Sequence, residues 1–379
     1  MISHEPIGAG KKTALCSRKA IGLSASFLNT ILCNDSFHKE GASMTLCFKK
    51  SVLVLIAGGV LSCAVGLTGG ACVGAAEVAT ATQTGAARRV IAADDSKRTL
   101  AAIAADGTVE WKRANGAIHD LHLLPNGHLL MQDGWTRIIE LDKDRQKVWE
   151  YDAKQGENAK RPIEVHAFQR LPDGVTMIVE SGPARILEVN RDGTIRKEIK
   201  LTVKNPSAHS DTRNARKTAA GTYLVAHEKD GVIREYEADG KLIWEFDVPL
   251  FGKAPTTNGD HGPKGFGNQA YSAVRLANGN TLIGTGNGHS VLEVTPQKEI
   301  VWKIEQNDLP GITLAWVTQV SRQPNGNTLL INCHAGAENP QIIEVSPDKK
   351  VVWTFKDFTT FGNSTTVAVV FDPAAEETK

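Results

Sequence analysis

The sequence predicts an all-β protein, a six-bladed β-propeller whose four-stranded antiparallel blades form a closed ring. Three observations predict it: turn glycines recur at a regular interval, two further markers keep the same interval, and the C-terminus supplies a strand that the first repeat lacks. The cleanest repeat is AYSAVRLANGNTLIGTGNGHSVLEVTPQKEIVWKI, residues 270–304. It reads as four short strands separated by turns rich in Asn and Gly, residues that accept the positive φ of hairpin turns.

The repeat interval is about the length of one propeller blade. The turn glycines are Gly127, Gly174, Gly221, Gly279 and Gly326, at intervals of 47, 47, 58 and 47 residues. The third strands carry Glu140, Glu188, Glu235, Glu293 and Glu344, and the fourth strands carry Trp149, Lys197, Trp244, Trp302 and Trp353. A four-stranded unit of about 40–50 residues is typical of a β-propeller blade.

Five blades follow in order at residues 117–153, 164–201, 211–248, 269–305 and 316–357. A further blade has to be assembled from both ends of the chain. Residues 88–113 supply three strands, with Trp111 in its usual place and Ala102 where the glutamate would be, and the segment STTVAVVFDPA (364–374) supplies the innermost one. Pairing these segments closes the ring, so we expect a propeller at residues 88–374 and a short tail at 375–379.

The residues before the propeller resemble an export signal. Lys49 and Lys50 precede an apolar stretch and a run of small residues within 44–76, so we expect cleavage before Glu77 and an extracytoplasmic location, periplasmic or secreted. Met44 is then the expected start, residues 1–43 a disordered upstream extension, and residues 77–87 a linker. An uncleaved signal anchor remains an alternative, as does a lipid anchor on Cys63 within the lipobox-like segment 60–63.

The composition of the chain limits the classes of partner that we expect. The chain has 43 basic and 42 acidic residues, so bulk charge does not favour nucleic acid, and we expect membrane contact only through the signal or the lipid anchor. Of the six cysteines only Cys333 follows the expected cleavage site, so the propeller has no internal disulfide. We expect a monomer.

The repeated Trp and Glu residues are expected to be architectural, because a residue present in nearly every blade does not mark a unique site. The tryptophans would pack between neighbouring blades, and the glutamates would make a structural hydrogen bond or lie on a solvated edge. The extra residues of the longer interval fall in segment 249–269, on the face where the loops between second and third strands also lie. Binding residues tend to gather on such loops.

Function is expected where the blades differ, at the start of the innermost strands. The corresponding positions there are polar or aromatic: His119, His166, Arg213, Tyr271, Thr318 and Thr366, preceded by Glu164, Asp211, Gln269 and Trp316 and followed by Asp120, Asn214 and Gln319. We expect this ring to border the central channel and to bind a small molecule or a protein. His209, His261, His289 and His334 lie on the same face, but their spacing lacks a metal-binding pattern, so no metal and no cofactor is predicted.

The segment HDLHLLPNGHLL (119–130), with the later EVTP, EVSP, VWKI and VWTF segments, resembles the blades of arylsulfotransferase-like and other PQQ-like repeat propellers. The resemblance covers residues 88–374. It implies transfer of a sulfuryl group through a channel histidine, with His119 or His166 as nucleophile and Arg213 and Asn214 as sulfate-binding groups. Tyr271 and Thr318 depart from that family, because they stand where further histidines would be expected.

Two functions therefore stay open. The favoured one is an exported, non-catalytic propeller that binds a ligand or partner through Arg213, Asn214, Glu164, Asp211, Tyr271, Gln269, Trp316 and Thr318. The alternative is an arylsulfotransferase-like enzyme that uses His119 or His166. Convergence of His119, His166 and Arg213 around an open pocket would favour the enzyme, and a channel filled by Trp316 or Tyr271 would disfavour it.

Overall fold

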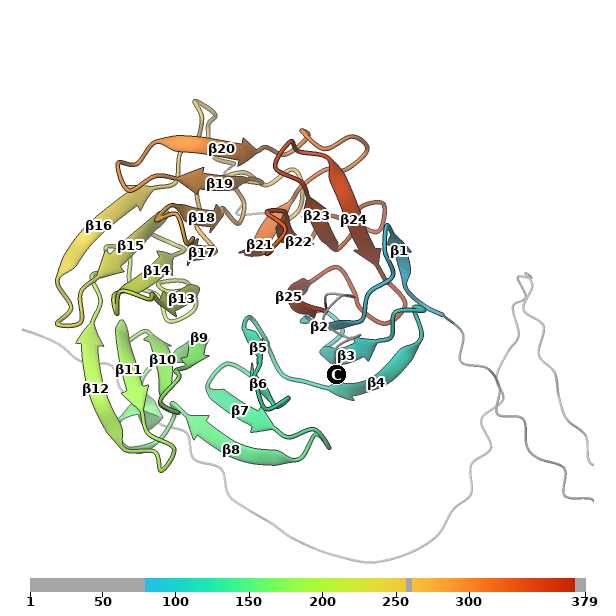
Figure 1. The fold of residues 1–379 in the computed structure, drawn as a ribbon. Coiled ribbons are helices and arrows are strands. Elements are labelled where there is room, and N and C mark those ends of the chain that lie inside the picture. The colour runs from blue at the N-terminus through green and yellow to red at the C-terminus, as the bar shows by residue number, and fades with distance from the viewer. Residues whose placement is uncertain (1–78, 257–260, 372–379) are drawn as a thin grey trace, which may run out of the picture. The chain divides into compact units, whose positions relative to one another are not determined.

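The computed structural model describes residues 79–256 and 261–371 (Figure 1). The expected upstream extension (1–43), export signal (44–76) and tail (375–379) lie outside the described residues. In the described part of the chain, no helix is long and apolar enough to cross a membrane.

Six antiparallel sheets form the ring (Figure 1), which confirms the predicted fold class. Blade 1 contains β25 (Thr365–Val370), β2 (Val90–Asp94), β3 (Thr99–Ile103) and β4 (Val109–Ala114). Blade 2 contains β5 (Leu121–Leu123), β6 (Leu129–Gln132), β7 (Arg137–Leu141) and β8 (Lys147–Asp152). Blade 3 contains β9 (Glu164–Arg170), β10 (Thr176–Ser181), β11 (Arg185–Val189) and β12 (Ile195–Lys200), and the 3₁₀ helix η1 (Gly156–Lys160) precedes it.

The other three blades repeat this order from the innermost to the outermost strand. Blade 4 contains β13 (Asn214–Lys217), β14 (Tyr223–His227), β15 (Val232–Tyr236) and β16 (Leu242–Asp247). Blade 5 contains β17 (Ser272–Arg275), β18 (Thr281–Gly284), β19 (Val291–Val294) and β20 (Ile300–Ile304). Blade 6 contains β21 (Trp316–Arg322), β22 (Thr328–Cys333), β23 (Ile342–Val345) and β24 (Val351–Lys356).

The ring closes as predicted, between the two ends of the propeller. Strand β25 pairs antiparallel with β2, from Val90 opposite Val370 to Asp94 opposite Thr365 (Figure 1). This pairing covers the inner edge of β2, which would otherwise expose unpaired backbone groups to the channel.

One strand was not expected from the sequence. Within the stretch expected to be a linker, β1 (Thr82–Thr84) pairs with β24 and adds a fifth strand to blade 6. The Trp353 indole N–H donates to the Gln83 side-chain oxygen at 3.0 Å. Because β1 is short, polar and largely exposed, it carries no apolar alternation by which the sequence could reveal a strand.

Apolar residues pack mainly between adjacent blades rather than at the hub. The second strands are buried along their whole length, as in β10 with the sequence TMIVES, whereas the outermost strands are largely exposed. One cluster joins Met177 and Val179 of blade 3 to Tyr223 and Val225 of blade 4. Each blade therefore depends on its neighbours to bury its apolar faces.

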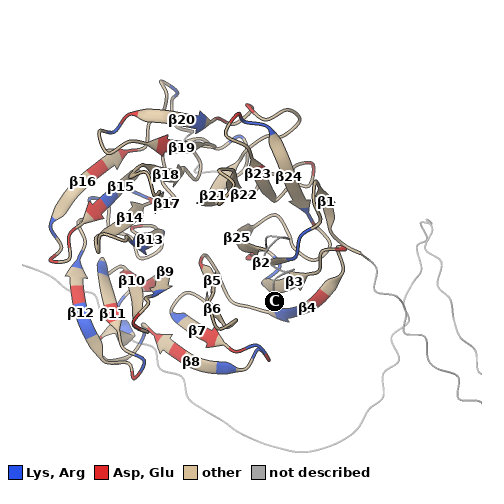
Figure 2. Ribbon diagram, in the orientation of Figure 1, with Lys and Arg blue, Asp and Glu red and all other residues tan. Residues whose placement is uncertain are grey.

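A polar contact repeats at these interfaces, beside the apolar clusters. In blade 2, Glu140 accepts a hydrogen bond at 2.8 Å from Arg170 of blade 3, and the guanidinium lies 5.1 Å from the centre of the Trp149 ring. The same contact joins Glu235 to Arg275 over Trp244, Glu293 to Arg322 over Trp302, and Glu344 to Arg88 over Trp353. We call this contact the Glu–Arg–Trp clamp. It contributes to the mixture of Lys and Arg with Asp and Glu around the ring (Figure 2).

The clamp varies at two interfaces. Ala102 of blade 1 offers no carboxylate, and there Arg145 lies 5.5 Å from the centre of the Trp111 ring. In blade 3, which has Lys197 in place of tryptophan, Glu188 pairs with Lys217 of blade 4 at 2.5 Å. The repeated glutamates are thus structural hydrogen-bond acceptors, one of the two roles that the sequence left open.

Removing the cation of one clamp is expected to destabilise the fold. Arg322→Ala would leave the largely buried Glu293 carboxylate without its guanidinium, and should lower the free energy of unfolding by about 2–3 kcal/mol. Urea denaturation measures this. The control is Lys241→Ala, whose side chain is 68% exposed and lies 3.9 Å from Glu237, and which should change the free energy by less than about 0.5 kcal/mol. Equal effects of the two substitutions would contradict a structural role for the clamp.

Candidate functional site

A cavity of about 320 Å³ lies where the innermost strands begin, at the hub of the ring. Every blade or its adjoining loops contribute to its wall. Of the residues predicted from the sequence, His119, Arg213, Gln269, Tyr271, Trp316, Thr318 and Thr366 line it. Trp316 and Tyr271 therefore form part of the wall of an open cavity and do not fill the channel.

The remaining predicted residues lie behind the wall or in the framework. His166 is buried against Arg213, and Glu164 contacts His166. Asp211 accepts a hydrogen bond from the Gly182 backbone N–H at 2.9 Å, which ties it to a neighbouring loop. Asn214 is buried and is not among the residues that line the cavity.

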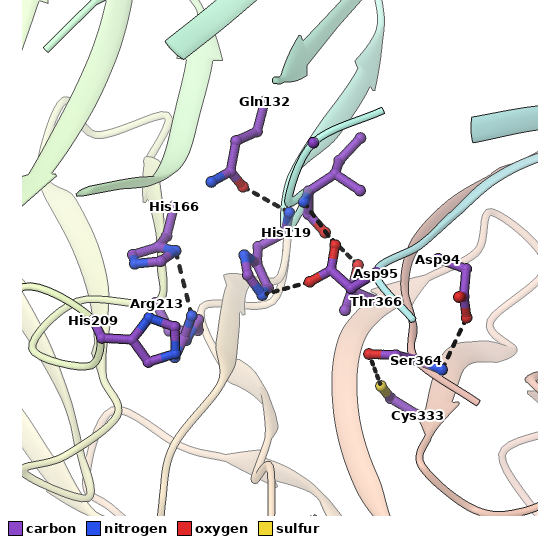
Figure 3. A network of polar contacts seen from close by, with 12 residues as sticks. Asp94, Asp95, His119, Gln132, His166, His209, Arg213, Cys333, Ser364 and Thr366 are labelled. Carbon is purple, nitrogen blue, oxygen red and sulfur yellow. Dashed lines mark hydrogen bonds and ion pairs between the residues drawn. The ribbon is translucent and has the colours of Figure 1, made fainter. Parts of the chain in front are cut away.

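His119 is held with one ring nitrogen free. Its Nε2 atom lies 3.3 Å from Asp95 Oδ2, and its backbone N–H donates to the Gln132 side-chain oxygen at 2.7 Å (Figure 3). Its ring stacks on Trp135 with 5.3 Å between the ring centres. Among the described residues, its buried Nδ1 atom has no hydrogen-bond partner. If Nε2–H faces the Asp95 carboxylate, Nδ1 carries a lone pair that is available to a bound molecule.

Both ring nitrogens of His166, in contrast, face protein groups. Arg213 Nη1 lies 3.3 Å from His166 Nδ1 (Figure 3), and since a guanidinium only donates hydrogen bonds, Nδ1 must be unprotonated. The imidazole proton then sits on Nε2, which lies 3.0 Å from Glu164 Oε2. His166 is therefore a positioning residue for Arg213, and His119 is the histidine with a free nitrogen.

Arg213 is itself neutralised. Its Nε–H donates to Glu228, which lines the same cavity, and its guanidinium lies 5.6 Å from the centre of the Tyr271 ring. This ion pair fixes Arg213 against Tyr271 and leaves little net positive charge at the cavity wall.

Burial shifts the protonation of the groups around the cavity. Burial, and next the charge of Arg213, holds the pKa of His119 well below its usual value and lowers the pKa of His166 to about 4. Burial raises the pKa of Asp95 to about 6. At neutral pH both imidazoles are therefore neutral and Asp95 is mostly ionised.

Glu164, His166 and His209 bring together a set of donor atoms that zinc commonly uses. The three ligand atoms lie within 4.8 Å of one another, and His209 Nδ1 lies 2.9 Å from Glu164 Oε2. Because Arg213 donates to His166 Nδ1, the proton occupies Nε2, the atom that a metal would need. This arrangement fits a hydrogen-bonded cluster better than a metal centre. The sequence showed no such spacing because His209 comes from the loop before the next blade.

Several cavity residues, among them Asp95, Glu228 and Trp135, were not predicted from the sequence. Asp95, Glu228 and His334 each stand directly after the second strand of their blade, and Trp135 lies in the corresponding loop of blade 2. The end of the second strand is thus a repeated position of the sequence that contributes to the cavity.

A buried ion pair crosses the channel farther along the innermost strands. Arg216 of blade 4 donates two hydrogen bonds of 2.8 Å to the two carboxylate oxygens of Asp120, which lies next to His119. Burial opposes ionisation of Asp120, but Arg216 and His122 lower its pKa far below the usual range. The pair ties blade 2 to blade 4 just beyond the cavity.

Fold and repeats together define a six-bladed β-propeller of PQQ-like repeats. A PQQ-type family model described as outer membrane protein assembly factor BamB matches residues 59–223, ending at the first residue of β14. No curated protein matches the sequence. The resemblance to arylsulfotransferases remains a prediction.

One of the similar solved structures shares this fold. A protein of unknown function from Bacteroides caccae is 21% identical, with 75% of this chain and 98% of that chain aligned and a TM-score of 0.62. A streptogramin B lyase (14% identical; 72% of this chain and 87% of that one; TM-score 0.47) and a virginiamycin B lyase from Staphylococcus aureus (12% identical; the same coverage; TM-score 0.47) are more distant. At these identities the likeness concerns fold alone.

The lowered pKa of His166 predicts acid sensitivity. Its pKa is about 4 when folded and near 6.5 when unfolded, so the unfolded chain binds more protons and stability falls as pH drops from 6.5 towards 4. His166→Gln should reduce the loss of unfolding free energy between pH 7 and pH 4 by about 3 kcal/mol. Urea denaturation at both pH values measures it. Lys241→Ala, at a side chain that is 68% exposed and lies outside this cluster, should keep the wild-type profile. A wild-type profile in His166→Gln would contradict the assignment.

Proposed function

We propose that this protein binds a small polar molecule in the cavity at the channel mouth and acts as a binding propeller. The observation that carries the proposal is a set of three buried polar atoms on cavity-lining residues, His119 Nδ1, Tyr271 Oη and Thr318 Oγ1, without hydrogen-bond partners among the described residues. Each such group costs about 1–3 kcal/mol when left unsatisfied in a protein interior. A ligand that bonds to all three would offset that cost.

The shape of the site favours a small molecule over a protein partner. A cavity of about 320 Å³ is at the lower end of the range for small-ligand pockets, and it corresponds to the volume of about ten water molecules. Trp135 and Trp316 give it aromatic wall surface, and its polar side chains come from different blades. A protein partner would reach these groups only by inserting a side chain.

A catalytic role for His119 is the second candidate, favoured by its free Nδ1 and by the contact of its other nitrogen with Asp95. A neutral Nδ1 could attack the sulfur of an aryl sulfate, the bond from sulfur to the aryl oxygen would break, and the sulfuryl group would then pass to an acceptor hydroxyl. Asp95 and Glu228 would repel the sulfate, however, and Arg213 is already paired. We therefore place binding first.

Export supports the proposed role. Residues 44–76 have the features of an export signal, and the family model is described as an outer membrane assembly factor. We infer that the propeller works outside the cytoplasm. Mass spectrometry of the protein purified from an exporting bacterial host should find a mature N-terminus at Glu77, or a lipid on Cys63 if the lipobox-like segment is used. A protein that retains residues 44–76 unmodified would contradict export with cleavage.

Cavity binding can be tested with a fragment library followed by ligand-observed NMR and calorimetry. We expect fragments whose affinity falls at least tenfold in the double variant Tyr271→Phe, Thr318→Val, because two hydrogen bonds are worth about 1–3 kcal/mol together. Val301→Ala, on the outer strand β20, is the control and should leave affinities unchanged. If no bound fragment responds to the cavity variant, the proposal fails.

The catalytic alternative is tested with 4-nitrophenyl sulfate as donor and a phenol as acceptor. Release of 4-nitrophenol would make catalysis the leading function if His119→Ala abolishes it and His166→Ala only weakens it.

A further inference from the structure

We propose that the ligand of the cavity is an uncharged sugar of the size of a mono- or disaccharide. This inference rests on the proposed binding function and names its ligand class. Three properties of the cavity carry it: the balance of charge on its wall, the kind of polar group left free, and the aromatic surfaces beside those groups.

The cavity wall carries two carboxylates and one guanidinium, and this charge disfavours an anionic ligand most strongly. Asp95 and Glu228 both line the cavity, so an anion would meet two carboxylates. Arg213 lines it too, so a cation would meet a guanidinium, and the Arg213–Glu228 ion pair already satisfies both groups. Of the histidines that line the cavity, His119 is neutral at neutral pH because burial lowers its pKa. A neutral ligand avoids desolvating a charge against a like charge.

The polar groups without hydrogen-bond partners are suited to bind the hydroxyl groups of a ligand. Tyr271 Oη and Thr318 Oγ1 can each donate and accept one hydrogen bond, and His119 Nδ1 accepts one in the tautomer whose Nε2–H faces Asp95. These groups come from blades 5, 6 and 2, so they approach the ligand from different directions. A molecule with several hydroxyls arranged around one ring can reach all three, whereas a compact group such as a carboxylate presents its oxygens on one side.

Aromatic side chains supply the apolar part of the site. Trp135 is 37% exposed, its ring rests on His119, and it lines the cavity. Trp316 also lines the cavity on the blade 6 side, but it is 3% exposed and the centre of the His261 ring lies 4.4 Å from its ring centre, so Trp135 supplies the main aromatic surface. A pyranose ring has C–H faces and hydroxyl edges, so one face can pack on a flat indole surface while its edges reach polar groups. Tryptophan beside acidic, amide and hydroxyl side chains is the combination that such an amphipathic ring requires.

Ligands that differ only in charge test this directly. Calorimetry should compare the methyl glycosides of glucose, galactose and mannose, and the matching disaccharides, with their uronic acid and amino sugar counterparts. We expect at least one neutral glycoside to bind at least tenfold more tightly than both of its charged counterparts. Its affinity should also be nearly independent of salt, because no net charge is neutralised on binding.

Variants at the wall provide a second, independent reading. Trp135→Ala should weaken the bound glycoside at least tenfold, and Trp135→Phe should recover most of that loss because a ring surface is restored. Trp135 is partly exposed, so the substitution should not prevent folding. In Asp95→Asn, the affinity for the uronic acid relative to that for the neutral glycoside should rise at least fivefold. A general loss of folded protein would lower both affinities and leave this ratio unchanged.

The outcomes separate this inference from the binding proposal. If a charged counterpart binds as tightly as every neutral glycoside, the charge argument is overturned. If no glycoside binds, but fragments bind and lose affinity in the double variant Tyr271→Phe, Thr318→Val, the proposed ligand class is wrong and the proposal of cavity binding is retained. If neither glycosides nor fragments respond to the cavity variants, both proposals fail.

Discussion

Closure of the ring depends on six interfaces that have to fit together, and the Glu–Arg–Trp clamp is the polar contact that most of them share. An arginine from one blade lies over the tryptophan of the preceding blade and ends on its third-strand glutamate, as Arg170 does with Trp149 and Glu140. The guanidinium is suited to this place because it stacks on an aromatic face and still donates hydrogen bonds. Where one partner is missing, another basic residue takes over, as Lys217 does beside Glu188. The interface therefore keeps its geometry even where its residues vary.

The same closure builds the cavity. Strand β25 returns beside β2 and places Ser364 and Thr366 next to Asp95, which then contacts His119 of blade 2 (Figure 3). The Ser364 backbone N–H donates to Asp94 at 2.8 Å, so the last residue of β2 holds the residue that precedes β25. The fold and the site depend on the same contacts here, because the residues that hold the first blade together also position Asp95 beside His119.

The blades were predictable because turn glycines need a particular backbone conformation, and Gly127, Gly174 and Gly326 all have positive φ. The same register placed His119, Arg213 and Tyr271 at the hub. It did not reveal Asp95 or Glu228, which converge on the cavity from the ends of second strands, nor the contact of His209 with Glu164 across a blade connection. Strand β1 was missed because its pairing uses backbone groups and one glutamine, which leave no periodic pattern. Spacing along the chain thus predicted the four-stranded blades and the residues at the start of the innermost strands, but not the contacts between different strands.

Pairing between β25 and β2 also sets the order in which the molecule can mature. Asp94 and Ser364, which meet at this seam, are 270 residues apart in sequence, so the seam forms only after nearly the whole chain has been synthesised. Until then the first three strands of blade 1 have an unpaired inner edge, and such non-local contacts form slowly and expose the intermediate to aggregation. A partly synthesised chain lacks the side of the cavity that β25 supplies. The wall of the cavity is therefore complete only in molecules that have finished folding.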